Sequence, residues 1–357
     1  MWSLDQSKKD GMSMKAALYN GQDKMEVQEC PDPIPDAYDV IVKVKATGIC
    51  DSDLLVYNDK EEADELPAGH EVTGEIVDTG SSTDKNLLGK RVAIETIGQG
   101  RACSVCWYCR TGQYKHCQDL TENDGGGFAE YIKRKAIGCY EIADSMSWEE
   151  GALVEPLAVS IHGVKRGLMQ GGESVVILGS GTIGLTTVMA ARRLGAGKIF
   201  VTARHPQQAE MALALGADYA YNPDEHQFNQ VILDHTEGRG ADMAIETGGG
   251  NSDSTLLQSI ESTRAQGRIV ILGGFRRRLA FDWLNPLIKE QSIIFSLCYG
   301  LTDGYHDYET AISILSDNET NLNNIVTHKY PLASIQEAFE CAYDKSKGSI
   351  KVQIHQT

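Results

Sequence analysis

The sequence predicts an α/β protein with two domains, a β-rich half followed by a doubly wound parallel sheet. Its 357 residues exceed the usual size of one hydrophobic core, and 41% of them are apolar, so two cores can form. The first half alternates apolar and polar residues over short runs, whereas buried strands alternate with helices beyond Gly171. The second pattern is typical of a parallel sheet whose two faces are covered by helices.

The first domain is expected over residues 1–164, with strands separated by frequent glycine and proline. Alternation of apolar and polar residues predicts three short strands, at 39–46, 72–77 and 90–94, as in a small irregular barrel. After Tyr299 the sequence predicts two helices and a closing strand at 349–354. Because that tail is too short to fold alone, residues 300–357 are expected to complete the first domain.

The second domain is expected over residues 165–299 and is a sheet of the Rossmann type. Its strands are the mostly apolar runs at 174–179, 198–203, 219–221, 243–247, 268–272 and 293–297. The helices between them are predicted at 182–194, 206–215, 228–236 and 252–263. Six strands that alternate with helices in this way form a parallel, doubly wound sheet.

Charge and cysteine usage exclude several classes of protein. The chain has 33 Lys and Arg against 50 Asp and Glu, a net charge of −17, whereas nucleic-acid binders carry a basic surface. No apolar run is long and uninterrupted enough for a membrane span or a secretory signal, so we expect a cytoplasmic protein without a membrane or nucleic-acid partner. Four of the nine cysteines lie close together, which in this compartment favours metal binding over disulfides.

A glycine-rich turn after the first strand of the second domain predicts a dinucleotide site. The six residues of the turn are Gly179, Ser180, Gly181, Thr182, Ile183 and Gly184. They fit the pattern G-x-G-x-x-G between a buried strand and a helix, where the helix N-terminus attracts a pyrophosphate. The alternative is a plain glycine turn of an α/β fold.

The end of the next strand predicts which dinucleotide binds. NAD-binding domains carry an acidic residue about 20 positions beyond the turn, which binds the ribose 2′-hydroxyl. Here that position is Ala203, between Thr202 and Arg204. Because a guanidinium can bind a 2′-phosphate through two charge-assisted hydrogen bonds, we predict NADP(H) in preference to NAD(H). The alternative is that Arg204 is a solvated loop residue and either cofactor is used.

A cysteine-rich segment predicts a structural zinc ion. Its four thiols follow the spacing C-x2-C-x2-C-x7-C and belong to Cys103, Cys106, Cys109 and Cys117. Four thiolates in one short loop suit tetrahedral zinc and leave no position open for a substrate. Two disulfides or four unbound thiols are the alternative.

Three further residues are candidate ligands of a second zinc ion. Cys50, His70 and Glu155 offer a thiolate, an imidazole and a carboxylate, and three protein ligands leave the fourth position that catalytic zinc requires. Taken one at a time, each has an ordinary explanation: a buried thiol, a core histidine, and a carboxylate at the start of a helix with Pro156 in its first turn.

Taken together, these segments resemble the zinc-dependent medium-chain dehydrogenase/reductase family, in particular its polyol, sugar and threonine dehydrogenase branch. The runs at 69–77, 126–131 and 348–352 are similar to it as well. The resemblance covers nearly the whole chain after Met14, and the residues before Met14 match nothing in the family.

The resemblance implies a GroES-like first domain that holds a catalytic zinc ion through Cys50, His70 and Glu155. It implies that Glu71 is either an exchangeable ligand or a carboxylate behind the ligands, and that the Ser52 hydroxyl passes on the proton of the alcohol. It also implies two zinc ions per subunit and a homodimer or homotetramer. The chain departs from the branch at Asp51, where glycine is usual, and in the short segment 118–125, which leaves the substrate open.

The expected function is a zinc-dependent alcohol dehydrogenase or ketone reductase that uses NADP(H) and a small polar secondary alcohol or ketone. Within the family, the alternative is an NAD-dependent enzyme of the threonine or sorbitol type. Outside the enzymes, the alternative is a crystallin-like structural protein that binds NADPH without turnover.

Overall fold

The computed structural model describes residues 13–59, 65–223, 228–280, 282–302, 304–317 and 321–356. The residues before Met14, which match nothing in the family, lie outside this described part except for Ser13. The described chain divides into two compact units. The first comprises the residues up to Cys106, residues 117–152 and the residues from His328 onward, and the second comprises residues 107–116 and 153–327.

The first unit contains a seven-stranded sheet and a separate hairpin. The hairpin pairs β1 (Ser13–Tyr19) with β2 (Met25–Pro31). The sheet has the order β16-β17-β3-β4-β5-β7, with β6 also paired to β3. Its strands are β3 (Asp39–Gly48), β4 (Glu71–Thr79), β5 (Arg91–Glu95), β6 (Tyr131–Lys135), β7 (Cys139–Glu141), β16 (Val326–Pro331) and β17 (Lys351–His355).

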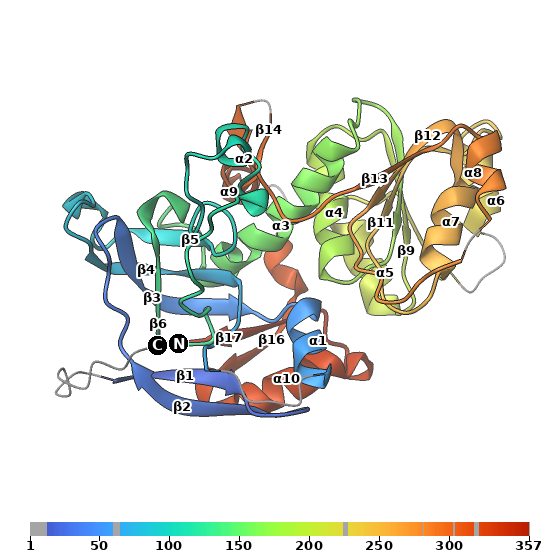
Figure 1. The fold of residues 1–357 in the computed structure, drawn as a ribbon. Helices are drawn as coiled ribbons and strands as arrows, with labels where there is room; N and C mark the ends of the chain where they lie inside the picture. The colour runs from blue at the N-terminus through green and yellow to red at the C-terminus, as the bar shows by residue number, and fades with distance from the viewer. Residues whose placement is uncertain are drawn as a thin grey trace. The chain divides into compact units, whose positions relative to one another are not determined.

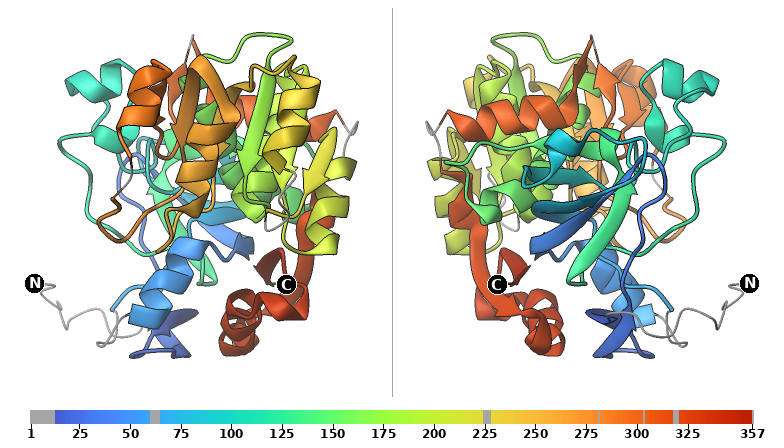
Figure 2. Two further views of the ribbon diagram at one scale, coloured as in Figure 1. Left: turned by 90° about the vertical axis from the view of Figure 1, so that its right-hand side faces the viewer. Right: turned by 90° about the vertical axis from the view of Figure 1, so that its left-hand side faces the viewer.

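The hydrophobic core of the first unit explains why the end of the chain belongs to it. The strand β17 pairs antiparallel with β3, and α10 (Ile335–Tyr343) packs against both β2 and β17. Figures 1 and 2 show this red helix beside the blue hairpin. Phe339 of α10 contacts the rings of Tyr19, Tyr57 and Phe128, so aromatic packing fixes the tail in place.

The second unit contains the predicted sheet of six parallel strands in the order β10-β9-β8-β11-β12-β13. This order places the first strand of the unit, β8, beside its fourth, β11, as in a Rossmann sheet. The strands are β8 (Ser174–Leu178), β9 (Lys198–Thr202), β10 (Tyr219–Tyr221), β11 (Ala241–Glu246), β12 (Thr263–Ile271) and β13 (Ser292–Phe295). Figure 1 shows helices on both faces, with α4 (Thr182–Arg193) on one face and α7 (Ser254–Ser262) on the other.

Apart from α3 (Trp148–Arg166), which has 19 residues, the remaining elements are short. The other helices are α1 (Asp51–Asp59), α2 (Trp107–Arg110), α5 (Pro206–Ala214), α6 (Phe228–His235), α8 (Leu284–Ile288) and α9 (Asp307–Ser316). A two-stranded sheet joins β14 (Leu301–Thr302) to β15 (Tyr305–His306). Single 3-10 turns lie at Lys85–Leu87, Tyr114–His116, Ala136–Gly138, Leu322–Ile325, Leu332–Ser334 and Lys345–Lys347. No helix in the described part of the chain is both long and apolar enough to cross a membrane.

The two units differ from the expected division of the chain at 164 and 300. Part of α3 belongs to the second unit because its glycines bring it close to the parallel sheet, Gly163 against Leu272 and Gly167 against Met243 and Val270. The helix α9 also belongs to the second unit. The buried Asp307 at its start accepts hydrogen bonds from His162 and Lys165 of α3, a long-range contact that the sequence pattern does not contain.

The histidine that begins α9 makes the stability of the second unit depend on pH. His306 is buried, and its side chain accepts a hydrogen bond from the backbone N–H of Tyr308 as the helix cap. Burial lowers the pKa of His306 from 6.5 to about 4. The unfolded chain therefore binds a proton more readily than the folded chain between these two values, and stability is lost as the pH falls through this window.

We expect His306→Asn to reduce this pH dependence, since asparagine also caps helices but has no charge to gain. Between pH 7 and pH 5, the wild-type chain should lose about 2 kcal/mol more of its unfolding free energy than the variant. Urea denaturation at the two pH values measures the difference. If the wild-type and variant proteins lose equal amounts, His306 does not titrate as described.

Candidate metal and nucleotide sites

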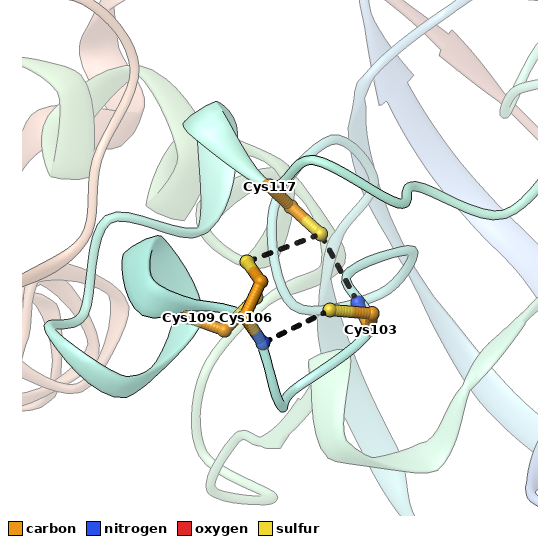
Figure 3. A group of neighbouring side chains, drawn as sticks. All are labelled: Cys103, Cys106, Cys109 and Cys117. Carbon is orange, nitrogen blue, oxygen red and sulfur yellow. Dashed lines mark hydrogen bonds between the residues drawn. The ribbon is translucent and has the colours of Figure 1, made fainter.

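The cysteine segment forms a compact group of four thiols (Figure 3). The sulfur atoms of Cys103, Cys106, Cys109 and Cys117 all lie within 4.8 Å of one another. All nine cysteines of the chain are free thiols. The alternative of two disulfides is therefore not found. The sulfur of Cys117 accepts backbone hydrogen bonds from Cys103 (3.3 Å) and Asp119 (3.4 Å), and the sulfur of Cys103 accepts one from Cys106 (3.3 Å).

These hydrogen bonds prepare the thiols for a metal. Backbone N–H groups of Val105 and Cys106 lower the pKa of the Cys103 thiol, because a donor stabilises the thiolate that zinc requires. Four sulfur atoms at this spacing fit a tetrahedral zinc ion with a closed coordination shell. The group thus fits the structural zinc ion expected from the spacing of the cysteines.

A second group of metal-binding side chains joins the ends of β3 and β4 in the first unit. Ligand atoms of Cys50, His70 and Glu71 lie within 4.8 Å of one another. The register pairs Gly48 with Glu71, and a Cβ atom at Gly48 would overlap the Glu71 carboxylate. The sheet therefore brings the three residues together, and glycine at position 48 gives the carboxylate its room.

Each member of this group is held by residues that the sequence did not reveal. Asp53, buried in α1, accepts a hydrogen bond from the backbone N–H of Cys50 at 2.9 Å. Its other oxygen lies 3.7 Å from Nδ1 of His70, the relation in which a carboxylate orients a metal-binding histidine. Burial raises the pKa of Asp53, although the charge of His70 opposes the shift.

Glu71 is bound by a buried lysine from the last strand. Nζ of Lys351 lies 2.7 Å from both Glu71 oxygens and also donates to the carbonyl of Ile49 at 2.9 Å. The side chains of Lys351 and Glu71 are each 1% exposed. Burial alone would lower the pKa of Lys351, but the charge and hydrogen bond of Glu71, together with the charges of Cys50 and Asp51, outweigh burial and raise the pKa. The buried pair holds the Glu71 carboxylate beside Cys50 and His70, where a ligand or a carboxylate behind the ligands would lie.

The other predicted members of the reactive site take different positions. Ser52 is exposed on α1, two residues beyond Cys50, and the neighbouring Asp51 lies 3.8 Å from Nζ of Lys345. Glu155 is buried in α3 and belongs to the second unit, so its part in zinc binding stays a prediction. The alternative that Pro156 marks a helix start is wrong, because α3 begins at Trp148 and Pro156 lies inside it.

The glycine turn of the second unit has the geometry of a nucleotide cradle. Gly179 has a φ of +112°, which favours glycine, and its N–H donates to Oγ1 of Thr202 at 2.8 Å. A Cβ atom at Gly184 would overlap the Gly179 carbonyl, whereas one at Gly181 would meet nothing within 4 Å. Gly184 thus serves helix packing, and Gly181 leaves open space at the N-terminus of α4, where a pyrophosphate fits.

The residues expected around the ribose lie at the carboxyl end of β9. Ala203 is buried and donates its N–H to Tyr221 at 2.7 Å. Arg204 is exposed and forms no ion pair with any residue that the structure describes. Ser180 donates its hydroxyl to Gln208 at 3.1 Å. A guanidinium that the described residues leave without an ion pair suits a 2′-phosphate.

Comparison with known proteins adds independent findings. The alcohol dehydrogenase GroES-like domain matches residues 36–144, and the zinc-binding dehydrogenase domain matches residues 182–317. The chain is 34% identical to a sorbitol dehydrogenase of Bacillus subtilis over 352 residues, covering 96% of this chain and 97% of the relative. It is 33% identical to an L-threonine 3-dehydrogenase of Pyrococcus horikoshii over 327 residues, covering 88% and 91%.

A solved structure with a bound cofactor is also similar. A zinc-binding dehydrogenase from Sinorhizobium meliloti, bound to NADP, superposes with a TM-score of 0.85 at 25% identity. The match covers 97% of this chain and all of that one. The GroES-like first domain and the Rossmann-type second domain expected from the sequence are therefore confirmed.

The two glycines of the nucleotide cradle provide a matched test. We expect Gly181→Ala to fold normally and to weaken dinucleotide binding at least tenfold, since its methyl group would fill the space a pyrophosphate needs. Gly184→Ala should instead lower stability by roughly 1–3 kcal/mol, because it forces α4 away from β8. Thermal unfolding and fluorescence titration with NADPH measure the two effects. Unweakened binding by a folded Gly181→Ala protein would contradict the cradle.

Proposed function

This chain belongs to the zinc-dependent medium-chain dehydrogenase/reductase family, and on that premise we propose that it transfers a hydride between NADP(H) and a small polar secondary alcohol or ketone. The single observation that carries the proposal is the convergence of Cys50, His70 and Glu71 on one point. A thiolate, an imidazole and a carboxylate form a donor set that suits catalytic zinc. Family membership makes the protein an oxidoreductase that acts on CH–OH groups.

We assign the catalytic zinc to Cys50, His70 and Glu155, with Glu71 as an exchangeable ligand or as the carboxylate behind them. When bound, zinc supplies the Lewis acidity that makes an alcohol acidic near neutral pH. Asp53 fixes the orientation of His70, and Lys351 holds the Glu71 carboxylate in place. Ser52, exposed at the start of α1, takes the proton that the substrate hydroxyl releases.

We infer a polyol or sugar-like substrate because the relatives include a sorbitol dehydrogenase. The alternative, an NAD-dependent enzyme of the sorbitol or threonine type, is favoured by the L-threonine 3-dehydrogenase among the relatives. Assays with polyols, sugars, amino alcohols and simple ketones, each with both cofactors, separate these two candidates.

We also infer a homodimer or homotetramer in solution. Large apolar side chains are exposed on α8 and at the edge strand β13, at Trp283, Leu284, Leu287, Ile288 and Phe295. Apolar side chains gathered beside an open strand edge are typical of a surface that a second copy covers. The mass in solution, compared with 39.0 kDa for one chain, tests this inference.

The two zinc sites predict distinct losses on substitution. The wild-type protein should contain two zinc ions per chain. Cys50→Ala should retain one ion and the fold but lose at least a hundredfold in turnover, because the Lewis acid is absent. Cys103→Ala should lose the other ion and unfold at a lower temperature, because its metal stabilises a loop. Metal analysis, thermal unfolding and turnover are the measurements.

The control is Cys30→Ala, which should keep both ions and full turnover. A wild-type content of one zinc ion, with no turnover on any substrate of the panel, would instead support the crystallin-like structural protein.

The cofactor preference depends on Arg204. We expect Arg204→Asp to raise the Michaelis constant for NADPH at least tenfold, because a carboxylate repels the 2′-phosphate that the guanidinium binds. The constant for NADH should change less than threefold. Arg239→Asp, a change of equal charge at another exposed arginine, is the control. Equal effects of Arg204→Asp on the two cofactors would defeat the assignment.

A further inference from the structure

A large cavity lies within the second unit and takes no part in the function proposed above. Its volume is about 880 Å³, within the range of pockets that bind small organic molecules. It is lined by residues 111–113, 115 and 116 of the cysteine segment, by the last turns of α3, and by the residues at and after the ends of β12 and β13. All of these segments belong to the same unit.

The polar lining of this cavity has one sign of charge. Five basic side chains face it, and none of the described lining residues is acidic; the five are Lys115, His116, His162, Lys165 and Arg166. The chain as a whole carries a net charge of −17, so most of its surface repels anions. In such an acidic chain, basic side chains gathered in one cavity produce a local positive potential, which attracts an anionic ligand.

Two of the five basic side chains are held in place by one buried carboxylate. Asp307, with a fully buried side chain, lies 2.9 Å from Nζ of Lys165 and 2.8 Å from Nδ1 of His162. It also accepts the backbone N–H of Gly300 at 2.9 Å. Burial opposes its ionisation, but the hydrogen bond and charge of His162, together with Lys165, lower the pKa of Asp307 overall.

The fixed geometry leaves donors for a ligand. An ionised carboxylate only accepts hydrogen bonds, so Nδ1 of His162 carries the proton that faces Asp307, and its Nε2 has no role in that contact. The ammonium group of Lys165 has three protons and gives one to Asp307 and one, at 3.4 Å, to Thr310. Because one carboxylate offsets only one charge, Lys115 and Arg166 keep the cavity positive.

The rest of the lining is apolar. Phe275 and Leu297 contribute side chains, together with Ile271 and Leu272 at the end of β12. A simple inorganic anion would use the cations and leave this apolar surface in contact with water. A molecule with a carbon skeleton attached to its anionic group would use both surfaces.

We propose that this cavity binds an organic phosphate monoester, with the phosphate on the cluster of Lys165, Arg166, Lys115 and the two histidines and the carbon skeleton on Phe275 and Leu297. A phosphate dianion matches a site with several cations, and a guanidinium can bind two of its oxygens in parallel. The lining residues include no zinc ligand and no residue of the glycine turn, and neither zinc binding nor hydride transfer is needed for this site.

The test uses phenyl phosphate and inorganic phosphate as probes, titrated calorimetrically into the full chain at constant ionic strength set with chloride. We expect one molecule of phenyl phosphate to bind, more tightly than inorganic phosphate. Arg166→Glu should weaken this binding at least tenfold. Arg239→Glu, which changes the net charge equally at an exposed arginine outside the cavity, should change it less than twofold.

Phosphate bound at the glycine turn affects both variants alike and cancels in their comparison. If Arg166→Glu fails to fold, Arg166→Gln removes the charge with less disturbance and should still weaken binding. Equal affinities of the two variants would overturn the proposal, and so would equal affinities of the wild type for the two probes. Absence of phenyl phosphate binding up to 10 mM would overturn it as well, whereas loss of turnover alone bears only on the proposed function.

Discussion

The buried ion pair between Lys351 and Glu71 is the interaction on which the reactive group depends. A carboxylate enclosed by protein must be paired or it takes up a proton. Lys351 provides the pair from the last strand and also binds the carbonyl of Ile49, next to Cys50. It therefore links β17 to the ends of β3 and β4. Removing one partner of such a pair typically costs roughly 3–5 kcal/mol, so the same contact stabilises the sheet and holds Glu71 beside the candidate zinc ligands.

The second unit uses a buried carboxylate in a comparable way. Asp307 joins α9 to α3 through Lys165 and His162 and accepts the N–H of Gly300. In the first unit the carboxylate faces a candidate metal site, whereas in the second it positions cations around a cavity. In both, a charge inside the protein is tolerated because several donors converge on it. Each site is thus organised by a buried carboxylate whose hydrogen bonds are satisfied, and not by an exposed loop.

The chain is an oxidoreductase of the zinc-dependent medium-chain family, and its own residues account for the separate tasks. The glycine turn and α4 form a cradle with a positive end, and the cysteine segment forms a closed metal site whose thiols already accept backbone hydrogen bonds. Cys50, His70 and Glu71 form a more open group, supported by Asp53 and Lys351. In the function proposed above, these parts divide cofactor binding, structural stability and chemistry among different segments of the sequence.

Patterns in the sequence predicted the features that depend on interactions between neighbouring residues. The six parallel strands, the helix that Pro206 begins and the glycine turn follow from periodicity, from the fixed φ of proline and from the backbone freedom of glycine. The four thiols could be predicted because zinc ligands in one short loop have characteristic spacing. Asp53 could have been found as well, since a carboxylate three residues after Cys50 fits the third position of a helix.

Only the tertiary structure decided the long-range charges and the extent of α3. Lys351 lies 280 residues from Glu71, and Asp307 lies 145 residues from His162, so no spacing rule connects them. Pro156 suggested a helix start, but α3 begins eight residues earlier, because packing of its apolar face outweighs the one backbone hydrogen bond that proline removes. The sequence by itself determined the elements, the thiol loop and the dinucleotide turn. The tertiary structure determined which buried charges meet, because their pairing depends on the folding of strands and helices that are distant in the chain.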